Sequence, residues 1–560
     1  MLRHSLRSPA AAASRLSAHA AARSLSSSAA QQEYDYVIVG GGSAGCVLAN
    51  RLSADPSNKV LLVEAGPSDR FKWDSWKIHM PAALTYNLAN DRYNWFYYTE
   101  PQKNLDNRRL PWPRGRVLGG SSCLNAMVYI RGHAYDYDDW EESGAKGWSY
   151  ADCLPGNQKD QILFKKFIDA GVQAGYPFTD DMNGYQQEGF GWMDMTVHKG
   201  WRWSAATAYL RPAEERKNLT VITDTLVNKV LFEGKKAVGI EAEDKTKTVS
   251  KIHAAKEVIL SGGAINSPQL LMLSGVGNAD DLKEVGVPVT HHLPAVGQNM
   301  EDHLDLYVQY QCTKPITLHN ATWKYPHNMV KIGLQWFLTQ TGMAASAHLE
   351  SGGFIRSAPG KRHPDLQYHF LPGSLTGQLT PGQEHAMQAH CSPMRATSRG
   401  YLKLRSANPR EHPIIEPNYL STPEDVVDIR AAVRLTREIF EQQVFDELRG
   451  DPISPAQSVK TDAEIDAWVR QHTESAYHPS CTNRMGEGEN TVVDSQTRVH
   501  GLENLRIVDA SIMPNIVSGN LNAPTIMIAE KAADIILGKS ALPKSTAPVY
   551  QPANWETSQR

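Results

Sequence analysis

A run of glycines between a short apolar strand and a helical stretch constrains this chain more than any other feature. Gly40, Gly42 and Gly45 have the G-x-G-x-x-G spacing and follow the apolar run Tyr36–Val39. In this spacing the first glycine permits a tight turn, the second lets a pyrophosphate approach the backbone, and the third lets helix pack on strand. A helix over 44–52 then points its N-terminus at the phosphates. The sequence therefore predicts a dinucleotide-binding β-α-β unit.

The second strand of this unit ends in an acid. The apolar run Lys59–Val63 precedes Glu64, close to the offset of about 20 residues at which an acid binds a ribose. An acid here disfavours a 2′-phosphate, and Ser43 joins the site from inside the glycine turn. A glycine-rich turn of an unrelated α/β protein is the alternative, but strand, helix and acid together favour the nucleotide site.

Length, charge and cysteine usage narrow the class of protein. A chain of 560 residues is too long for one ordinary core, so two or more domains are expected. The formal net charge of −3 and the lack of a long apolar stretch argue against nucleic-acid binding and a membrane span. The six cysteines are scattered without C-x-x-C or metal-site spacing, so no metal site is predicted and a reducing compartment fits.

The first 30 residues have a different composition. They contain four arginines, many serines and alanines, and no acid, the first acid being Glu33. This is typical of a mitochondrial transit peptide, and the continuous apolar core of a secretory signal is missing. A merely disordered tail is the alternative, which explains the arginines less well. We assign residues 1–30 to a transit peptide and exclude them from the fold.

Further strand and helix patterns indicate interleaved domains. Around 219–242, alternating residues predict a small antiparallel meander whose first strand is Leu219–Ile222. The strand Glu257–Leu260 leads through a glycine turn to Ser267 and Pro268, which suit the N-cap and first turn of a helix. The strand 505–509 and a helix from Pro524 to Ile536 return near the end of the chain, where they could complete the nucleotide fold. The helix Asp425 to Gln442 belongs to a second domain.

Two long segments resemble the signatures of the glucose-methanol-choline (GMC) oxidoreductases. Residues 115–138, with Gly119-Gly120-Ser121-Ser122 and Leu124-Asn125, resemble the first signature, and residues 263–277 resemble the second. The resemblance spans about 34–538 and is strongest to choline-oxidising members, through 76–84 and 188–195. It implies a mixed α/β fold in which a Rossmann-like FAD-binding domain is interleaved with a substrate-binding domain of antiparallel sheet and helices. The implied divisions are FAD-binding segments 34–150, 216–310 and 471–540, substrate-binding segments 151–215 and 311–470, and a C-terminal tail 541–560.

The resemblance also implies the cofactor and its contacts. FAD would be held by Gly40, Gly42, Ser43 and Gly45 at the pyrophosphate, Glu64 at the adenosine ribose, Val227 at the adenine, Val117 and Asn125 at the flavin end, Asp509 near the ribityl chain, and Asn522. Some members bind flavin covalently through a histidine at the position of Leu124. Because leucine cannot form that link, we expect non-covalent FAD.

Alcohol oxidation needs a base for the hydroxyl proton while hydride leaves the adjacent carbon. Neutral histidine suits this role, but the residues alone prefer none of the 20 histidines, most of which are expected to be surface or core residues. The resemblance selects His478 as acid/base and Asn520 as its partner. An amide can hydrogen-bond the substrate oxygen without competing for the proton. Asn522 better suits a capping role at the following helix.

A quaternary ammonium substrate requires aromatic faces and a carboxylate, because it cannot donate conventional hydrogen bonds. Candidates for the aromatic walls are Tyr477, Trp73, Trp76 and Trp95, with ordinary packing as the alternative for the tryptophans. Glu350 is the candidate carboxylate. His369 resembles a second active-site histidine, with an ordinary strand histidine as the alternative.

The implied reaction is the oxidation of choline to betaine aldehyde, with electrons passed to a quinone or another acceptor. The implied location is the mitochondrial matrix or the matrix face of the inner membrane, where peripheral contact needs no spanning helix. One departure stands out, since only the short link 156–161 follows Pro155 where family members carry a longer segment. The alternatives are a related alcohol or sugar dehydrogenase or oxidase, a lyase on the same scaffold, and an inactive flavoprotein.

Overall fold

The structure is a computed structural model. It describes residues 33–70, 72–89, 91–143, 145, 162–376, 380–543, 546 and 548–560. The expected transit peptide, the short link 156–161 and Cys153 lie outside the described residues. The five cysteines within them are buried and unpaired. In this part of the chain, no helix combines the length and apolar character that a membrane crossing requires.

One of the two large sheets contains the predicted nucleotide-binding unit. Its strands lie in the order β10-β2-β1-β13-β12-β11, with β26 beside β13. Their bounds are β1 Tyr34–Val39, β2 Val60–Val63, β10 Leu219–Ile222, β11 Thr225–Glu233, β12 Lys236–Asp244, β13 Val249–Leu260 and β26 Leu505–Ile507. The parallel part, β10-β2-β1-β13-β26, has the 3-2-1-4-5 strand order of Rossmann-like domains. The predicted mixed α/β fold is confirmed.

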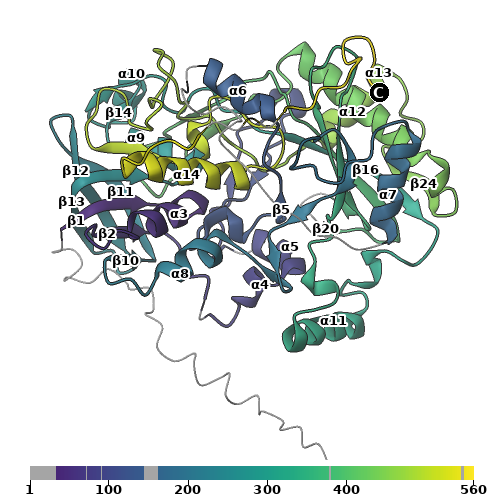
Figure 1. The fold of residues 1–560 in the computed structure, drawn as a ribbon, viewed down its shortest axis with the longest axis horizontal. Coiled ribbons are helices and arrows are strands. Elements are labelled where there is room, and N and C mark those ends of the chain that lie inside the picture. The colour runs from purple at the N-terminus through teal and green to yellow at the C-terminus, as the bar shows by residue number, and fades with distance from the viewer. Residues whose placement is uncertain are drawn as a thin grey trace, which may run out of the picture.

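Helices from distant parts of the chain cover this sheet. Helix α3, Ser43–Leu52, follows the glycine turn and packs against α14, Asn522–Ile536, as Figure 1 shows. Helix α9, Gly263–Leu273, follows β13. Because β26 pairs in parallel with β13 and α14 packs on α3, the end of the chain completes the nucleotide-binding fold, as predicted.

Two predicted elements differ from the structure. The strand β10 pairs in parallel with β2, so it does not belong to the antiparallel meander, which consists of β11, β12 and β13. Helix α9 begins at Gly263, with Ser267 and Pro268 inside it, so the predicted cap at Ser267 is wrong. Pro268 is tolerated because the carbonyl of Ala264, four residues earlier, accepts a hydrogen bond from Thr482 Oγ1 at 2.7 Å instead.

The second large sheet is antiparallel and lies to the right in Figure 1. Its order is β24-β16-β21-β18-β17-β6, with β25 beside β16. The bounds are β6 Gly189–Trp192, β16 Leu304–Cys312, β17 Ser351–Ile355, β18 Leu366–Leu371, β21 Ala386–Pro393, β24 Arg449–Ser454 and β25 Glu474–Ser475. Helices α7, Ile162–Gln173, and α12, Pro423–Phe440, pack against it. Since β16 starts at Leu304, this sheet includes residues from before the expected boundary at 310.

The core of this second unit is aromatic. Phe167 of α7 stacks on Phe370 of β18 with ring centroids 4.8 Å apart, and Phe440 of α12 packs beside both. Stacked and edge-on aromatic contacts bury large apolar areas. These contacts hold α7 and α12 against the antiparallel sheet.

Shorter elements connect these two units. The other α-helices in the described residues are α4 Trp76–His79, α5 Leu84–Leu88, α6 Ala134–Glu142, α8 Arg211–Ala213, α10 Ala279–Glu284, α11 Pro326–Thr339 and α13 Asp462–His472. The short paired strands are β3 Tyr97–Tyr98 with β4 Pro111–Trp112, β5 Val128–Tyr129 with β7 Asp194–Met195, β8 Val197–His198 with β9 Trp201–Arg202, β14 Val276–Gly277 with β15 His291–His292, β19 Leu375–Thr376 with β20 Thr380–Pro381, and β22 Tyr401–Lys403 with β23 Ile414–Glu416. Helices α4, α5 and α11 lie on one side of the molecule, at the bottom of Figure 1.

Candidate active site

A cavity of about 760 Å³ joins the two units. Gly40, Glu64 and Asp509 line it from the first unit, at the ends of β1, β2 and β26. Asp305 and His369 line it from the second sheet. Ligands of Rossmann-like sheets bind outside the carboxyl ends of the parallel strands, where the strand order reverses. The cavity therefore brings a nucleotide-type site and the substrate-side sheet together.

The glycine turn has the geometry that a close approach of phosphate requires. Gly40 has φ +103°, and a Cβ there would lie 2.5 Å from the carbonyl oxygen of Ser261. A Cβ at Gly45 would lie 1.9 Å from the carbonyl oxygen of Gly40, so only glycine lets α3 pack on the turn. Gly40 and Gly42 line the cavity, whereas Gly45 lies behind them.

Glu64 occupies the predicted position in the cavity wall. Its carboxylate accepts hydrogen bonds of 2.8 Å from the backbone N–H groups of Gly41 and Gly66. Burial raises the pKa of this carboxyl to about 7, in spite of these two donors. Glu64 thus braces the glycine turn from the next strand, while facing the cavity.

Three further predicted cofactor residues make contacts between segments that are distant in the sequence. Asp509 Oδ2 accepts hydrogen bonds from Gly263 N at 2.8 Å and from Ser267 Oγ at 2.6 Å. Ser43 Oγ donates to Asn522 Oδ1 at 2.8 Å, which joins the starts of α3 and α14. Ser43, Asp509 and Asn522 all line the cavity. Asn522 opens α14 without capping it, so the predicted capping role is wrong.

Val227, expected at the adenine, and the two residues expected at the flavin end, Asn125 and Val117, are placed differently. Val227 and Asn125 line the cavity, and Asn125 Oδ1 accepts a hydrogen bond of 2.8 Å from Arg202. The side chain of Val117 is buried in an apolar cluster with Ile78, Tyr93, Cys123 and Leu124, behind the lining residues. Leu124 itself reaches the cavity.

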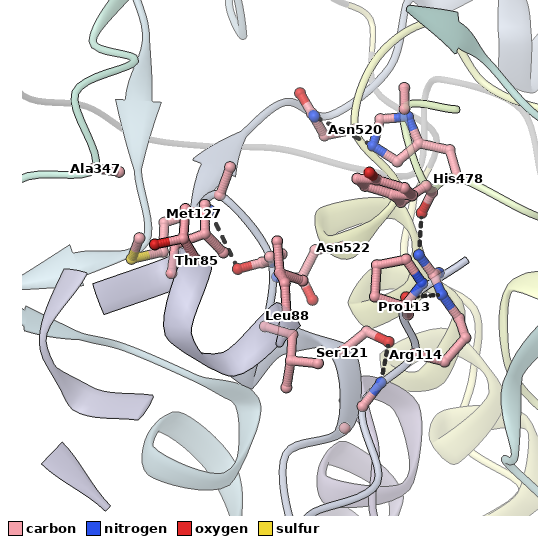
Figure 2. A pocket seen from close by; sticks show the side chains of 18 of the residues that line it. Thr85, Leu88, Pro113, Arg114, Ser121, Met127, Ala347, His478, Asn520 and Asn522 are labelled. Carbon is pink, nitrogen blue, oxygen red and sulfur yellow. Dashed lines mark hydrogen bonds between the residues drawn. The ribbon is translucent and has the colours of Figure 1, made fainter. Parts of the chain in front are cut away.

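His478 and Asn520 lie side by side in the cavity wall (Figure 2). Asn520 Nδ2 is 3.3 Å from His478 Nε2, and His478 Nδ1 is 3.0 Å from His303 Nδ1. Since the amide NH₂ can only donate, Nε2 of His478 carries the lone pair and Nδ1–H donates to His303. The Nε2 atom is therefore the basic nitrogen, and it is turned toward Asn520 and the cavity.

Burial keeps the histidines of this wall neutral. It lowers the pKa of His478 well below the ordinary value, with further contributions from His303 and Arg114. It also lowers the pKa of His303 to about 3 and that of His369 to about 4. Desolvation disfavours the protonated form of each ring. The His478 imidazole is therefore ready to accept a proton at neutral pH.

A buried carboxylate that the sequence did not indicate holds the His478 loop. Asp302 Oδ1 accepts a hydrogen bond of 2.7 Å from the backbone N–H of His478. Asp302 Oδ2 accepts hydrogen bonds from Ser475 Oγ and Tyr419 OH. Arg114 donates to the carbonyl of Tyr477 at 2.5 Å, across from His478 in Figure 2. Tyr477 has φ +64°, a strained conformation that persists only where its surroundings impose it. This network fixes the position of the imidazole.

The substrate candidates are brought together only in part. His369 and Tyr477 line the cavity, and His369 Nε2 lies 3.4 Å from Asn520 Oδ1. Glu350 does not line it, although residues 347–349 do; its carboxylate bonds the Ser346 hydroxyl, and burial raises its pKa. Of the three tryptophans, Trp76 and Trp95 line the cavity, whereas Trp73 is 80% exposed away from it.

Asp305 is the carboxylate of the substrate wall that sequence reasoning missed. It stands on β16, lines the cavity, and accepts hydrogen bonds from His390 Nδ1 at 2.8 Å and Ser392 Oγ at 3.0 Å. The signal was present, because Asp305 is the acid within the predominantly apolar strand 304–312. An acid inside a buried strand is unusual unless it is paired or functional.

Comparisons with known proteins agree with this arrangement. Models of the GMC oxidoreductase family match residues 34–305 and 396–529. The chain is 58% identical to the protein named mitochondrial choline dehydrogenase from Homo sapiens, over 96% of this chain and 95% of that protein. It is 49% identical to an oxygen-dependent choline dehydrogenase of Photobacterium profundum, over 94% of this chain and 97% of that protein.

A solved structure shares the fold over nearly the whole chain. An FAD-dependent oxidoreductase from Chaetomium thermophilum superimposes with a TM-score of 0.80 at 26% identity, over 90% of this chain and 99% of that one. With both family matches and a relative at 58% identity, the chain belongs to the GMC oxidoreductase family.

Proposed function

We propose that this protein is an FAD-dependent choline dehydrogenase that oxidises choline to betaine aldehyde. The observation that carries the proposal is the pairing of the neutral base His478 with Asn520 in a cavity that also holds the carboxylate of Asp305. The identity of 58% to a choline dehydrogenase supports the same substrate. A base, an amide donor and an anionic pocket are the groups that a cationic alcohol requires.

The cavity residues fit FAD. The glycine turn would hold the pyrophosphate, Glu64 the ribose, and Asp509, Asn522 and Asn125 the remainder of the cofactor, since all of them line one continuous cavity. Around Gly42 the nearest atom to a Cβ position is 3.9 Å away, so the backbone there is open to phosphate. Leu124 in the cavity wall supports non-covalent binding. When bound, FAD supplies the acceptor for the hydride of the alcohol carbon.

In this proposal, His478 Nε2 removes the hydroxyl proton of choline as hydride leaves. Asn520 Nδ2, now next to that nitrogen, donates to the substrate oxygen and stabilises its developing negative charge. Asp302 and Arg114 hold the loop, so the base does not reorganise during the step. The buried wall excludes water, which strengthens these interactions.

The trimethylammonium group is proposed to sit against Asp305. Tyr307, Tyr477 and His390 line the same part of the cavity, and the Tyr307 and His390 rings lie 4.5 Å apart. Aromatic faces and a carboxylate attract a quaternary ammonium without hydrogen bonds. Asp305 thus takes the role that the sequence assigned to Glu350.

Replacing Asp305 by asparagine tests this role. Asp305→Asn is expected to raise the KM for choline by about tenfold or more, because an anion next to a desolvated cation is worth over 1.4 kcal/mol. The change should be far smaller for 3,3-dimethylbutanol, the uncharged isostere of choline. Steady-state kinetics with both alcohols measure the difference.

The matched control is Glu384→Gln, an acid at the exposed rim of the same cavity. It should leave both KM values nearly unchanged. Equal effects of Asp305→Asn on the charged and the uncharged alcohol would contradict the assignment.

We further propose that the enzyme works in the mitochondrion, as the name of its human relative and the arginine-rich start of the chain support. A quinone or another acceptor would reoxidise the flavin, and the bacterial relative named oxygen-dependent makes oxygen the alternative. We place the protein in the matrix or on the matrix face of the inner membrane.

A further inference from the structure

Helix α11 presents an apolar stripe to solvent. Val330, Leu334 and Leu338 recur every four residues, and Phe337 stands beside them, so all four side chains share one face of the helix. Their exposed fractions are 55%, 55%, 77% and 52%. Exposed contiguous apolar side chains of this kind mark an interaction surface. The helix projects from the edge of the molecule, away from both large sheets (Figure 1).

Within residues 306–349, the stretch that contains α11, every Asp, Glu, Lys or Arg is a lysine. Lys324, His327 and Lys331 are exposed on or next to α11, and no acid occurs between Asp305 and Glu350. Within the part of the chain that the structure describes, neither Lys324 nor Lys331 forms a salt bridge. Trp323, three residues before the first residue of α11, is 64% exposed. Aromatic and aliphatic side chains flanked by lysines are characteristic of helices that lie in the surface of an anionic bilayer.

The opposite face of α11 belongs to the mouth of the active-site cavity. Met329 and Ile332, turned away from the stripe, line the cavity. Phe337, at the edge of the stripe, lines it too and meets Trp76 of α4 with ring centroids 5.9 Å apart. On the same rim, Trp323 donates to Tyr86 OH at 2.7 Å. Phe337 and Trp323 therefore belong both to the cavity rim and to the exposed apolar surface of this segment.

We infer that α11 docks this protein on an anionic phospholipid bilayer, with the stripe Val330, Leu334, Phe337 and Leu338 among the lipids and Lys324 and Lys331 at the headgroups. Because Phe337 and Trp323 also line the cavity, its mouth then opens at the lipid surface, from which an apolar acceptor can enter. The entry of an acceptor from the lipid rests on the proposed quinone acceptor. The binding of α11 to lipid does not depend on that proposal. A second copy of the chain is a poorer occupant, because two-fold pairing would bring the lysines of this acid-free segment together.

The test is co-sedimentation of the full-length holoprotein with vesicles, in the absence of substrate. One set contains phosphatidylcholine alone and the other also contains cardiolipin, which is anionic. The holoprotein should sediment with the cardiolipin vesicles, and the double variant Leu334→Glu/Leu338→Glu should bind them about tenfold or more weakly. Neither leucine lines the cavity, and glutamate is a good helix former. An unchanged thermal midpoint will show that the variant is folded.

The matched control is Val427→Glu, on α12, where the side chain is 58% exposed. It should bind vesicles as the original protein does. The double variant Lys324→Gln/Lys331→Gln should lose the preference for vesicles with cardiolipin. It should keep the weaker binding to vesicles that the apolar side chains provide.

Three outcomes would overturn the inference. The first is no binding of the holoprotein to either vesicle, and the second is equal binding by the leucine variant. The third is a change of oligomeric state with unchanged vesicle binding: light scattering would show the original protein as a dimer and the leucine variant as a monomer. That result would make α11 an interface between copies of the chain. Because no turnover is measured, a wrong substrate assignment leaves these results intact.

Discussion

His478→Ala is expected to lower turnover with choline about a thousandfold while the protein keeps its flavin. General-base catalysis by a positioned histidine contributes about a hundredfold to ten-thousandfold to an enzymatic rate. His478 Nε2 is the basic nitrogen beside Asn520, and its burial leaves no solvent base in its place. Stopped-flow flavin reduction, normalised to bound FAD, measures the loss.

The pH dependence of kcat/KM in the unaltered enzyme provides a second test of His478 as the base. Because burial lowers the pKa of His478 well below 6.5, the neutral base persists as pH falls past that value. We expect kcat/KM for choline to stay level from pH 8 to about 6.5 and to decline only at lower pH, where the imidazole is protonated. In His478→Ala this acid limb should disappear.

The control is His253→Ala, which removes an exposed strand histidine far along the chain from the site. It should match the original protein in rate and pH profile. Turnover retained by His478→Ala would contradict the assignment of the base.

Asp302→Ala is expected to destabilise the protein by about 3 kcal/mol and to slow turnover about a hundredfold per bound flavin. The carboxylate accepts the His478 N–H at 2.7 Å and the Ser475 hydroxyl at 2.5 Å, and its loss leaves the buried Arg114 guanidinium without its nearby anion. The strained conformation of Tyr477 would then relax and displace the imidazole. Denaturant unfolding measures the first effect, and flavin reduction measures the second.

A control variant separates the effect on the position of His478 from the effect on the stability of the fold. Asp425 is also a buried carboxylate, which accepts from the backbone N–H groups of Thr397 and Ser398, outside the cavity lining. Asp425→Ala should lower the free energy of unfolding without changing turnover per bound flavin. An unchanged rate in Asp302→Ala would show that the carboxylate serves only the fold.

Local sequence was sufficient where neighbouring residues decide the structure. The apolar strand, the glycine turn and α3 follow from residues 36–52 alone, because each step depends on backbone freedom and helix packing within the unit. The start of α9 does not follow in this way. The hydroxyl that satisfies the Ala264 carbonyl beside Pro268 belongs to Thr482, more than 200 positions away. No local pattern contains that partner.

Two further differences from the sequence predictions have one cause. These are the parallel direction of β10 and the presence of Asp305, instead of Glu350, in the cavity wall. Residues 219–222 show the alternation of a strand, but only the partner β2 makes that strand parallel. Glu350 and Asp305 are both acids near apolar strands, and the register of β16 on β21, which pairs Tyr307 with His390, is what turns Asp305 into the cavity. Strand pairing over long separations, rather than residue type, decides which of these two acids lines the cavity.

One measurement tests both the substrate and the redox chemistry. In it, choline is added without oxygen to the purified protein with bound FAD. We predict that choline bleaches the absorption of the oxidised flavin, because in the proposed mechanism His478 and Asn520 promote hydride loss from the bound alcohol. Unchanged absorption, with FAD intact and bound, would contradict choline oxidation by this site.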